Sequence, residues 1–265
     1  MDGWLIELLA DPVTKQAVRP EHFQKENGVL DARIFLKHTA GYQDWNSGQF
    51  HYEQWEQANR EMSVQQFLEV IAYDRPIYQR FPMAGRILDV GGGRGTVREF
   101  LASGCEFVST DPWIGCMDAI PPNLLEAFTS LRQPLNFVAA MAEFLPFLAD
   151  SFDWVHMRSM LDHVQIPDLA LMEAHRVLKS DGRLLVGLWV EGGKSGVPGL
   201  RERVKEFVRD SLGRIGVDRW KDHHTWHPTY KNLRRLIEDN RFICEDVFWQ
   251  PQWKDNVCYI LAKKV

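Results

Sequence analysis

A short apolar run that ends in an acidic residue and a glycine-rich loop constrains this chain more than any other feature. Residues 86–95 read RILDVGGGRG. Glycines at 91, 93 and 95 allow the backbone to turn sharply and let a ligand approach where a Cβ would otherwise stand. We expect a strand over 86–90 and a helix that begins at Thr96 and runs to Ala102, with its free N–H groups facing the loop. The pattern predicts a nucleotide-binding unit, although a plain strand-to-helix turn has the same signature.

A second acidic residue, Asp111, follows the next apolar run, over 106–110. It lies about 20 residues after the loop, where a doubly wound fold places an acid that accepts the ribose hydroxyls of a nucleotide. Pro112 beside it also fits an ordinary Asp-Pro turn. A dinucleotide fingerprint would need its third glycine at position 96, where Thr96 stands. The spacing therefore weakens the case for a nicotinamide cofactor.

Apolar runs alternate with helical stretches through the middle of the chain, which is typical of a parallel sheet with crossover helices. Pro167 marks the start of one helix and Gly182 the position just beyond its end. Two later runs, at 242–250 and 256–262, lie close enough in sequence to form a terminal hairpin. The expected parallel strands are at 86–90, 106–110, 135–139, 152–157 and 183–189.

Six motifs in order give the chain a family resemblance over about residues 84–190. They are Ile87–Gly95, Asp111-Pro112, Ala142–Phe147, Ser151–Val155, Leu161–Val164 and Arg176–Leu184. The series resembles class I S-adenosylmethionine-dependent methyltransferases of the small-molecule type. The resemblance implies an α/β fold: a doubly wound, Rossmann-like, seven-stranded sheet with a terminal antiparallel hairpin. An N-terminal extension and a lid insertion after the fifth strand would be added to it.

The same resemblance implies which residues hold S-adenosylmethionine. Asp89, Gly91 and Gly93 would hold its methionine end, and Asp111 its ribose, with Pro112 and Trp113 beside the adenine. The segment Met141, Ala142 and Glu143 would meet the adenine edge, where Met141 stands in place of an aspartate often found in the family. Met157 and Arg158 would lie beside the transferred methyl group.

Four histidines are candidates for binding the acceptor or removing its proton: His163, His224, His227 and His156. His163 also fits a packing or helix-entry position, and the segment from His223 to His227 also fits a polar loop that caps a helix beginning at Thr229. Because Pro228 biases His227 toward an extended backbone and no carboxylate-rich motif accompanies the segment, we expect no metal site.

The residues before position 80 predict a separate N-terminal extension. The segments 4–15 and 28–30 resemble a short zinc-ribbon-like module that activates some methyltransferases as a separate subunit. Asp11 and Thr14 stand where that module carries cysteines, so we expect a metal-free form of it. The predicted domains are 1–80, comprising this segment and a helical lid, and 81–265, the methyltransferase domain, with 191–228 as a lid over the acceptor and a lid helix over 201–212.

Composition restricts the function classes. The chain has 265 residues, is 45% hydrophobic and carries a net charge of −5, which argues against a nucleic-acid substrate. It contains no apolar run of membrane-spanning length, no basic leader and no Cys-x-x-Cys pair. We expect a cytoplasmic enzyme with a small-molecule acceptor, and its state as monomer or homodimer stays open.

The sequence therefore predicts transfer of a methyl group from S-adenosylmethionine to oxygen or nitrogen of a small acceptor, of secondary-metabolite or sugar-like type. Quinone or lipid precursors stay open as acceptors. The alternatives are a non-catalytic protein that binds S-adenosylmethionine and an NAD-dependent oxidoreductase on the same fold.

Overall fold

The computed structural model describes residues 1–38, 57–196 and 224–265, together with positions 42, 46, 48, 54 and 204. His223 and nearly all of the expected lid helix over 201–212 lie outside the described residues. The prediction of a lid there is therefore not addressed by the structure.

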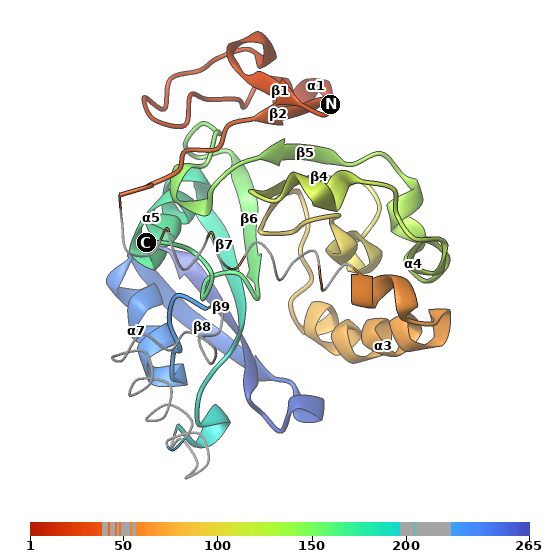
Figure 1. The fold of residues 1–265 in the computed structure, drawn as a ribbon. Coiled ribbons are helices and arrows are strands. Elements are labelled where there is room, and N and C mark those ends of the chain that lie inside the picture. The colour runs from red at the N-terminus through yellow and green to blue at the C-terminus, as the bar shows by residue number, and fades with distance from the viewer. Residues whose placement is uncertain are drawn as a thin grey trace.

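The described residues form one mixed sheet of nine strands in the order β1-β2-β5-β4-β3-β6-β7-β9-β8, with helices on both faces (Figure 1). The strands are β1 (Gln24–Glu26), β2 (Val29–Asp31), β3 (Arg86–Val90), β4 (Glu106–Asp111), β5 (Asn136–Ala139), β6 (Phe152–Arg158), β7 (Leu178–Trp189), β8 (Phe242–Trp249) and β9 (Val257–Lys264). The α-helices are α1 (Gly3–Ile6), α3 (Val64–Arg80), α4 (Pro122–Ala127), α5 (Pro167–Val177) and α7 (Tyr230–Asp239). Short 3₁₀ turns occupy Pro20–His22, Thr96–Phe100, Ile114–Met117, Thr129–Arg132, Ala142–Phe144, Gly193–Ser195 and Pro251–Trp253.

The five strands expected to be parallel, and the terminal hairpin, are confirmed. Strands β5, β4, β3, β6 and β7 pair in parallel, and β9 and β8 pair antiparallel beyond β7. The sheet is larger than expected, because β1 and β2 add two strands at the other edge through parallel pairing of β2 with β5. The expected count of seven was therefore too small: the N-terminal extension continues the sheet.

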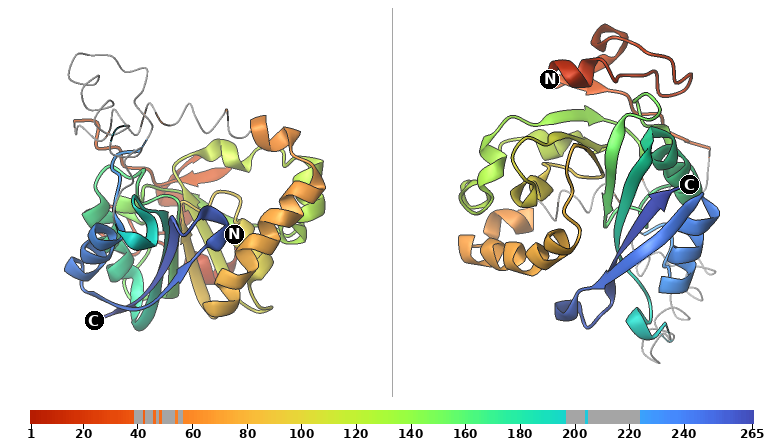
Figure 2. Two further views of the ribbon diagram at one scale, coloured as in Figure 1. Left: turned by 90° about the horizontal axis from the view of Figure 1, so that it is seen from below. Right: turned by 180° about the vertical axis from the view of Figure 1, so that it is seen from behind.

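Successive side chains of the central strands point to opposite faces of the sheet, so each face has its own part of the core. Leu88 and Val90 of β3 belong to the cluster under α5 and α7, whereas Ile87 belongs to the cluster under the second half of α3. Figure 2 shows α3 and α4 on one side of the sheet and α5 and α7 on the other. This two-sided burial is typical of parallel sheets with crossover helices, and it fixes the face to which each strand residue points.

Local signals explain the helix ends. Ser63 caps α3 by accepting the N–H of Gln66, and the Gln66 side chain accepts the N–H of Ser63 in return. Thr229 caps α7 by accepting the N–H of Asn232, which confirms the helix expected from that residue. No helix in the described part of the chain is long and apolar enough to cross a membrane.

Two local expectations were wrong. The helix expected from Thr96 to Ala102 is a 3₁₀ turn over Thr96–Phe100. Gly182 does not end a helix: α5 ends at Val177, β7 begins at Leu178, and Gly182 lies within β7. The pairing of β6 with β7 shifts there, from Phe152 opposite Leu178 to Trp154 opposite Arg183, so the intervening residues of β7 bulge out of register.

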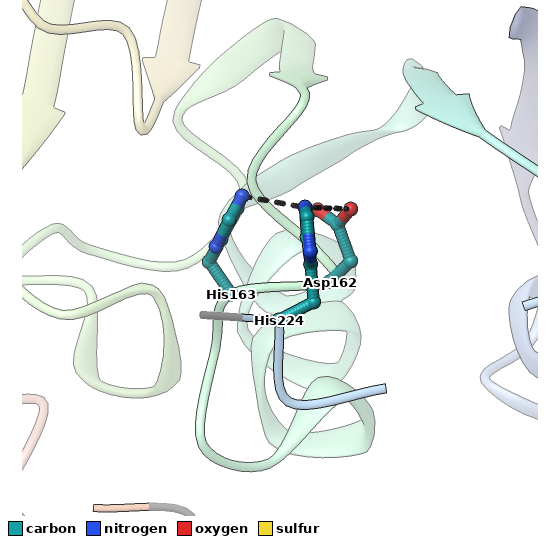
Figure 3. A group of neighbouring side chains, drawn as sticks. All are labelled: Asp162, His163 and His224. Atoms are coloured by element: carbon teal, nitrogen blue, oxygen red, sulfur yellow. Dashed lines mark ion pairs between the residues drawn. The ribbon is translucent and has the colours of Figure 1, made fainter. Parts of the chain in front are cut away.

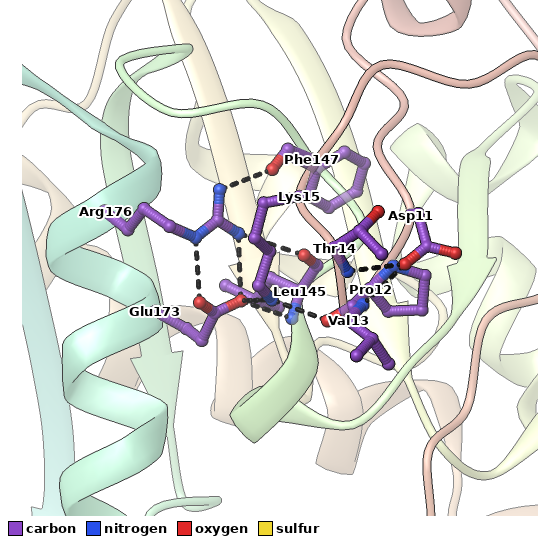
Figure 4. Close-up of polar contacts among 9 residues, drawn as sticks. All are labelled: Asp11, Pro12, Val13, Thr14, Lys15, Leu145, Phe147, Glu173 and Arg176. Carbon is purple, nitrogen blue, oxygen red and sulfur yellow. Dashed lines mark hydrogen bonds and ion pairs between the residues drawn. The ribbon is translucent and has the colours of Figure 1, made fainter.

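Polar contacts join the N-terminal extension to the face of the sheet that α5 covers (Figure 4). The Lys15 ammonium donates to Glu173 of α5 at 2.6 Å, and Arg176 binds the same carboxylate in a bidentate pair. Glu173 also accepts the N–H of Leu145, at 2.8 Å. Burial lowers the pKa of Lys15, against the opposing effect of Glu173. The extension is therefore held by a charged network as well as by buried Leu5 and Leu9.

Asp11 closes its own loop in this extension. Its carboxylate accepts the N–H groups of Val13 and Thr14 and contacts the His22 ring at 2.8 Å. The Thr14 bond, followed by the His22 contact, holds the pKa of the Asp11 carboxyl well below its usual range. Where a ribbon module would use a metal, hydrogen bonds hold this turn. The resemblance to that module stays a prediction.

Candidate functional site

The glycine loop lies at the point where the strand order reverses. From β3 the chain moves to β4 and β5 on one side, then crosses back to β6 on the other side of β3. Ligands of doubly wound sheets bind in the crevice beyond the carboxyl ends of the strands at such a point. The loops after β3 and β6 meet there: a Cβ added to Gly91 would lie 2.7 Å from Cβ of Met160.

Hydrogen bonds from β4 hold the loop in place. The N–H groups of Gly91 and Gly92 donate to the Thr110 carbonyl, and the Ser109 hydroxyl donates to the Gly93 carbonyl. Gly91 and Gly93 have positive φ angles, which favour glycine. A Cβ on Gly93 would have its nearest neighbours at 3.8 and 3.9 Å, on Cys116 and Asp111, so there is space beside this residue toward the Asp111 carboxylate.

Asp111 ends β4 facing the loop. One carboxylate oxygen accepts the N–H of Gly93 at 3.2 Å, and the other accepts the N–H of Trp113 at 2.9 Å. Burial raises the pKa of Asp111 to about 6, although both N–H groups act in the opposite direction. Each oxygen keeps a further lone pair, so the carboxylate can accept two more hydrogen bonds. The geometry suits the two hydroxyls of a ribose.

The N-terminal extension reaches the same region through Arg33, which sequence reasoning missed. Its guanidinium donates to the Pro112 carbonyl at 3.1 Å and pairs with Asp31. A groove of about 280 Å³ lies there, and Arg33, Pro112 and Trp113 are among its lining residues. Sequence gave no indication of this contact because 79 residues separate Arg33 from Pro112.

Asp89 and His156, expected at the methionine end and at the acceptor, form a buried pair instead. The His156 Nδ1 lies 2.7 Å from an Asp89 oxygen, and its Nε2 lies 3.4 Å from the Tyr78 hydroxyl. Their exposed fractions are only 3% and 1%. The side chains of Asp89 and His156 point to the α3 face of the sheet, beneath the glycine loop. The Asp89 carboxylate occupies the space that a side chain on Gly92 would need.

Met157 and Arg158 lie within β6 rather than after it, because the strand continues to Arg158. Met157 is fully buried in the core under α5. The Arg158 guanidinium makes a bidentate pair with Asp74 of α3, at 2.6 and 3.0 Å. Met157 therefore packs in the core and Arg158 anchors α3, and their place beside the transferred methyl group stays a prediction.

The segment after β5 is buried, with Met141 and Ala142 exposed by 2% and 5%. Glu143, expected at the adenine edge, caps the start of α5: its carboxylate accepts the N–H groups of Gln165 and Ile166, at 2.7 and 3.1 Å. Burial raises the pKa of this carboxyl. Both bonds go to one oxygen, and the other has no hydrogen-bond partner among the described residues, so a contact with the adenine edge stays a prediction.

Three of the four candidate histidines lie together, and Figure 3 shows two of them, His163 and His224, beside Asp162. The Nε2 atoms of His163 and His224 lie 3.8 and 3.5 Å from the Asp162 carboxylate, and their rings are 4.5 Å apart between centroids. The His227 ring lies 5.4 Å from that of His224. We call Asp162, His163 and His224 the histidine cluster. His156 is separate from it, in its buried pair beneath the glycine loop.

The histidine cluster is built from two segments far apart in sequence. The N–H of Thr225 donates to the Asp162 carbonyl at 2.7 Å, and the Trp226 indole donates to the Leu161 carbonyl at 2.9 Å. The N–H of His163 donates to the carbonyl of Met160, the residue that packs on Gly91. The cluster is therefore linked to the glycine loop through Met160, which lies two residues before Asp162 and three before His163. Sequence reasoning missed Asp162 and Met160, although Asp162 adjoins His163 in a motif that it did identify.

Comparison with known proteins identifies the central part of the chain. Residues 88–186 match a family model described as "Methyltransferase domain". A ubiquinone/menaquinone biosynthesis C-methyltransferase, UbiE, of Rhizobium etli is 42% identical over 104 residues. The matched segment covers 38% of this chain and 40% of that relative.

Solved structures support the fold. A 1,6-didemethyltoxoflavin-N1-methyltransferase from Burkholderia thailandensis, solved with S-adenosylhomocysteine, aligns with a TM-score of 0.54 at 17% identity, covering 88% of this chain and 94% of that one. A SAM-dependent methyltransferase from Methanosarcina mazei aligns with a TM-score of 0.52 at 22% identity, over 72% of this chain and 97% of that one. At these identities the likeness establishes the architecture.

Proposed function

We propose that this chain, whose residues 88–186 form an S-adenosylmethionine-dependent methyltransferase domain, transfers a methyl group from that cofactor to a small-molecule acceptor. The observation that supports it most is the meeting of the glycine loop with the loop that carries His163, through Met160 packed on Gly91. A cofactor in the crevice would place its ribose at Asp111. The acceptor would lie between the cofactor and the histidine cluster.

The proposed cofactor contacts are a reduced version of the expected set. Asp111 would accept the ribose hydroxyls, and Trp113 and Ala142 would meet the adenine. The bare Cα of Gly93, with open space beside it, would let the methionine end approach the backbone, and the backbone of Gly91, whose Cβ position Met160 occupies, would lie next to it. Asp89 is reassigned to support the loop from below, because its carboxylate is paired with His156.

Met141 and Pro112 stay in the proposed set as neighbours of these contacts. Glu143, Met157 and Arg158 belong to the expected set too, but each makes a structural contact or is fully buried, so the proposal does not rest on them.

At the acceptor end the histidine cluster would orient the nucleophile and take up its proton. The cofactor supplies the reactive methyl group, so the protein must align the acceptor atom, the methyl carbon and the sulfur, and exclude water. A carboxylate beside an imidazole orients the ring and stabilises its protonated form. Asp162 stands in that relation to His163 and His224, and His227 adjoins them.

This arrangement favours an acceptor with a hydroxyl or amine that loses a proton, and so oxygen or nitrogen methylation. Carbon methylation is a second candidate, because the matched relative is named a C-methyltransferase of quinone biosynthesis. Removal of a phenolic proton would serve both outcomes, since a phenolate is nucleophilic at oxygen and at its ring carbons. The division into domains 1–80 and 81–265, and a lid over 191–228, also stay proposals.

The proposal is tested with S-adenosylmethionine carrying a CD₃ group and pooled phenols, sugars, amines and quinone precursors, with products analysed by mass spectrometry. We expect a product heavier by one CD₃ unit less one proton, whose fragments identify the methylated atom. His163→Ala and His224→Ala should lower turnover by about 10² to 10⁴-fold.

The same two variants should leave affinity for S-adenosylhomocysteine within about threefold. His22→Ala, which removes a histidine paired with Asp11 on the N-terminal extension, serves as the control and should keep full turnover. Full turnover in the cluster variants would remove the histidines from the acceptor site. Binding of S-adenosylmethionine without any methylated product would favour a non-catalytic role.

A further inference from the structure

We infer that the histidine cluster is a binding site for a divalent transition-metal ion. Asp162, His163 and His224 each offer one ligand atom, and the three atoms lie within 4.8 Å of one another. The His163 Nε2 lies 3.8 Å from one Asp162 carboxylate oxygen, and the His224 Nε2 lies 3.5 Å from the other. Figure 3 shows the rings of His163 and His224 side by side, with the Asp162 carboxylate next to the His224 ring.

These distances are close to those in a metal site. With metal–ligand bonds of about 2.0–2.1 Å, two ligands of a tetrahedral ion lie about 3.3 Å apart. Small rotations of the side chains would therefore bring all three atoms onto one ion. Two imidazoles and one carboxylate form a ligand set that suits zinc, iron(II) and similar ions, and three protein ligands leave further positions open for another molecule.

Hydrogen bonds already hold together the two backbone segments that carry the ligands. Thr225 donates through its N–H to the Asp162 carbonyl and through its hydroxyl to the carbonyls of Asp162 and Val164. With the Trp226 bond to Leu161, these contacts fix the segment bearing His224 against the segment bearing Asp162 and His163. The cluster is partly enclosed: the side chains of Asp162, His163 and His224 are 9%, 16% and 29% exposed.

The sequence led us to expect no metal, because Pro228 biases His227 toward an extended backbone and no carboxylate-rich motif accompanies the three histidines. The fold brings a carboxylate, Asp162, to His224 from the loop after β6. With the ion bound, the Nε2 atoms of His163 and His224 are occupied, so the ion would activate the acceptor in their place: it would bind an acceptor oxygen and lower the pKa of its proton, as metal ions do for bound water. That use of the ion rests on the proposed function, whereas binding of the ion does not.

The test uses the full chain, freed of metal with a chelator, then titrated calorimetrically with Zn²⁺ alone and followed by visible absorption with Co²⁺. We expect one equivalent of each ion to bind, with a cobalt spectrum of nitrogen and oxygen ligation. Asp162→Asn, His163→Ala and His224→Ala should each weaken zinc binding by more than about 100-fold, since even outer-shell partners of a metal contribute about 10–100-fold. The more conservative His224→Gln should do the same.

His22→Ala is the matched control, because the His22–Asp11 pair has the same chemistry at 2.8 Å without a second histidine. It should leave the single equivalent unchanged. The inference is overturned if neither ion saturates at one equivalent, or if binding survives in His163→Ala and His224→Ala. Folding of each variant is checked by its unchanged affinity for S-adenosylhomocysteine. A chain that binds zinc at the cluster but methylates nothing would contradict the proposed function alone.

Discussion

Replacing Asp111 with alanine should weaken cofactor binding strongly. The carboxylate already accepts the N–H groups of Gly93 and Trp113, one on each oxygen, and keeps a lone pair on each for the two ribose hydroxyls. Hydrogen bonds to a charged group contribute about 1.5–3 kcal/mol. We take that range for the two ribose hydrogen bonds together, because water can replace the carboxylate as their partner in the variant. The affinity should then fall by about 13- to 160-fold.

The assay is calorimetric titration with S-adenosylhomocysteine at pH 7.5. Asp239→Ala is the control, because Asp239 is exposed on α7, outside the proposed site, and should change affinity by less than about twofold. Equal affinity in wild type and Asp111→Ala would refute the assignment of Asp111 to the ribose. Equal losses in both aspartate variants would show an effect that is not specific to Asp111.

Acid should weaken binding through the same residue. The pKa of Asp111 is raised by burial to about 6, so the accepting carboxylate is lost as the pH falls through that value. At pH 5 only about a tenth of the protein would carry the carboxylate, and the affinity should be about tenfold lower than at neutral pH. Asp111→Asn, which cannot ionise, should show a flat profile between pH 5 and 7.5. A wild-type profile as flat as that of the variant would contradict the reasoning.

Three further predictions concern the structure around the site. Gly92→Ala places a Cβ 2.2 Å from an Asp89 oxygen, so it should reduce cofactor affinity and destabilise the fold by about 1–3 kcal/mol, whereas Gly3→Ala, with open space around it, should do neither. Thermal unfolding with and without S-adenosylhomocysteine measures both effects, and a neutral Gly92→Ala would contradict the close packing. His156→Phe leaves the buried Asp89 charge without its partner, and urea denaturation should show a loss of about 3–5 kcal/mol; a loss below about 1 kcal/mol would mean that the pair is dispensable. Glu173→Gln weakens the contacts with Lys15 and Arg176 and should lower the free energy of unfolding by about 1–3 kcal/mol, whereas Glu238→Gln, in an exposed pair with Arg234, should change it by less than about 0.5 kcal/mol. Equal effects in the two glutamate variants would argue against the network that joins the N-terminal extension to α5.

The central strands could be predicted because burial on both faces leaves continuous apolar runs between turn signals. The hairpin of β1 and β2 could not be found that way, since β1 reads Gln24-Lys25-Glu26 and is exposed throughout. Its turn did carry a signal: Asn27-Gly28 is a strong two-residue hairpin sequence, and both residues have positive φ angles.

The residues of the candidate site likewise include some that the sequence could indicate and some that it could not. Asp111 and the glycines could be singled out because loop chemistry at strand ends is local in sequence, and their role in binding stays a prediction. The contacts of His156 and Arg158 could not be predicted, because alternation along β6 sends both side chains to the α3 face, where Asp89 and Asp74 lie 67 and 84 residues away in sequence. The histidine cluster joins Asp162 to His224, 62 residues later, and nothing in the sequence pairs the two. Such contacts arise from the fold rather than from a local pattern.

The most direct test of the account is competition for the glycine-loop crevice among S-adenosylmethionine, S-adenosylhomocysteine and NAD⁺. With the purified full chain in a calorimeter, we predict one equivalent of S-adenosylmethionine, displacement by S-adenosylhomocysteine, and no displacement by NAD⁺ at millimolar concentration. Binding of NAD⁺ in place of S-adenosylmethionine, or binding of S-adenosylmethionine that Asp111→Ala leaves intact, would contradict the account.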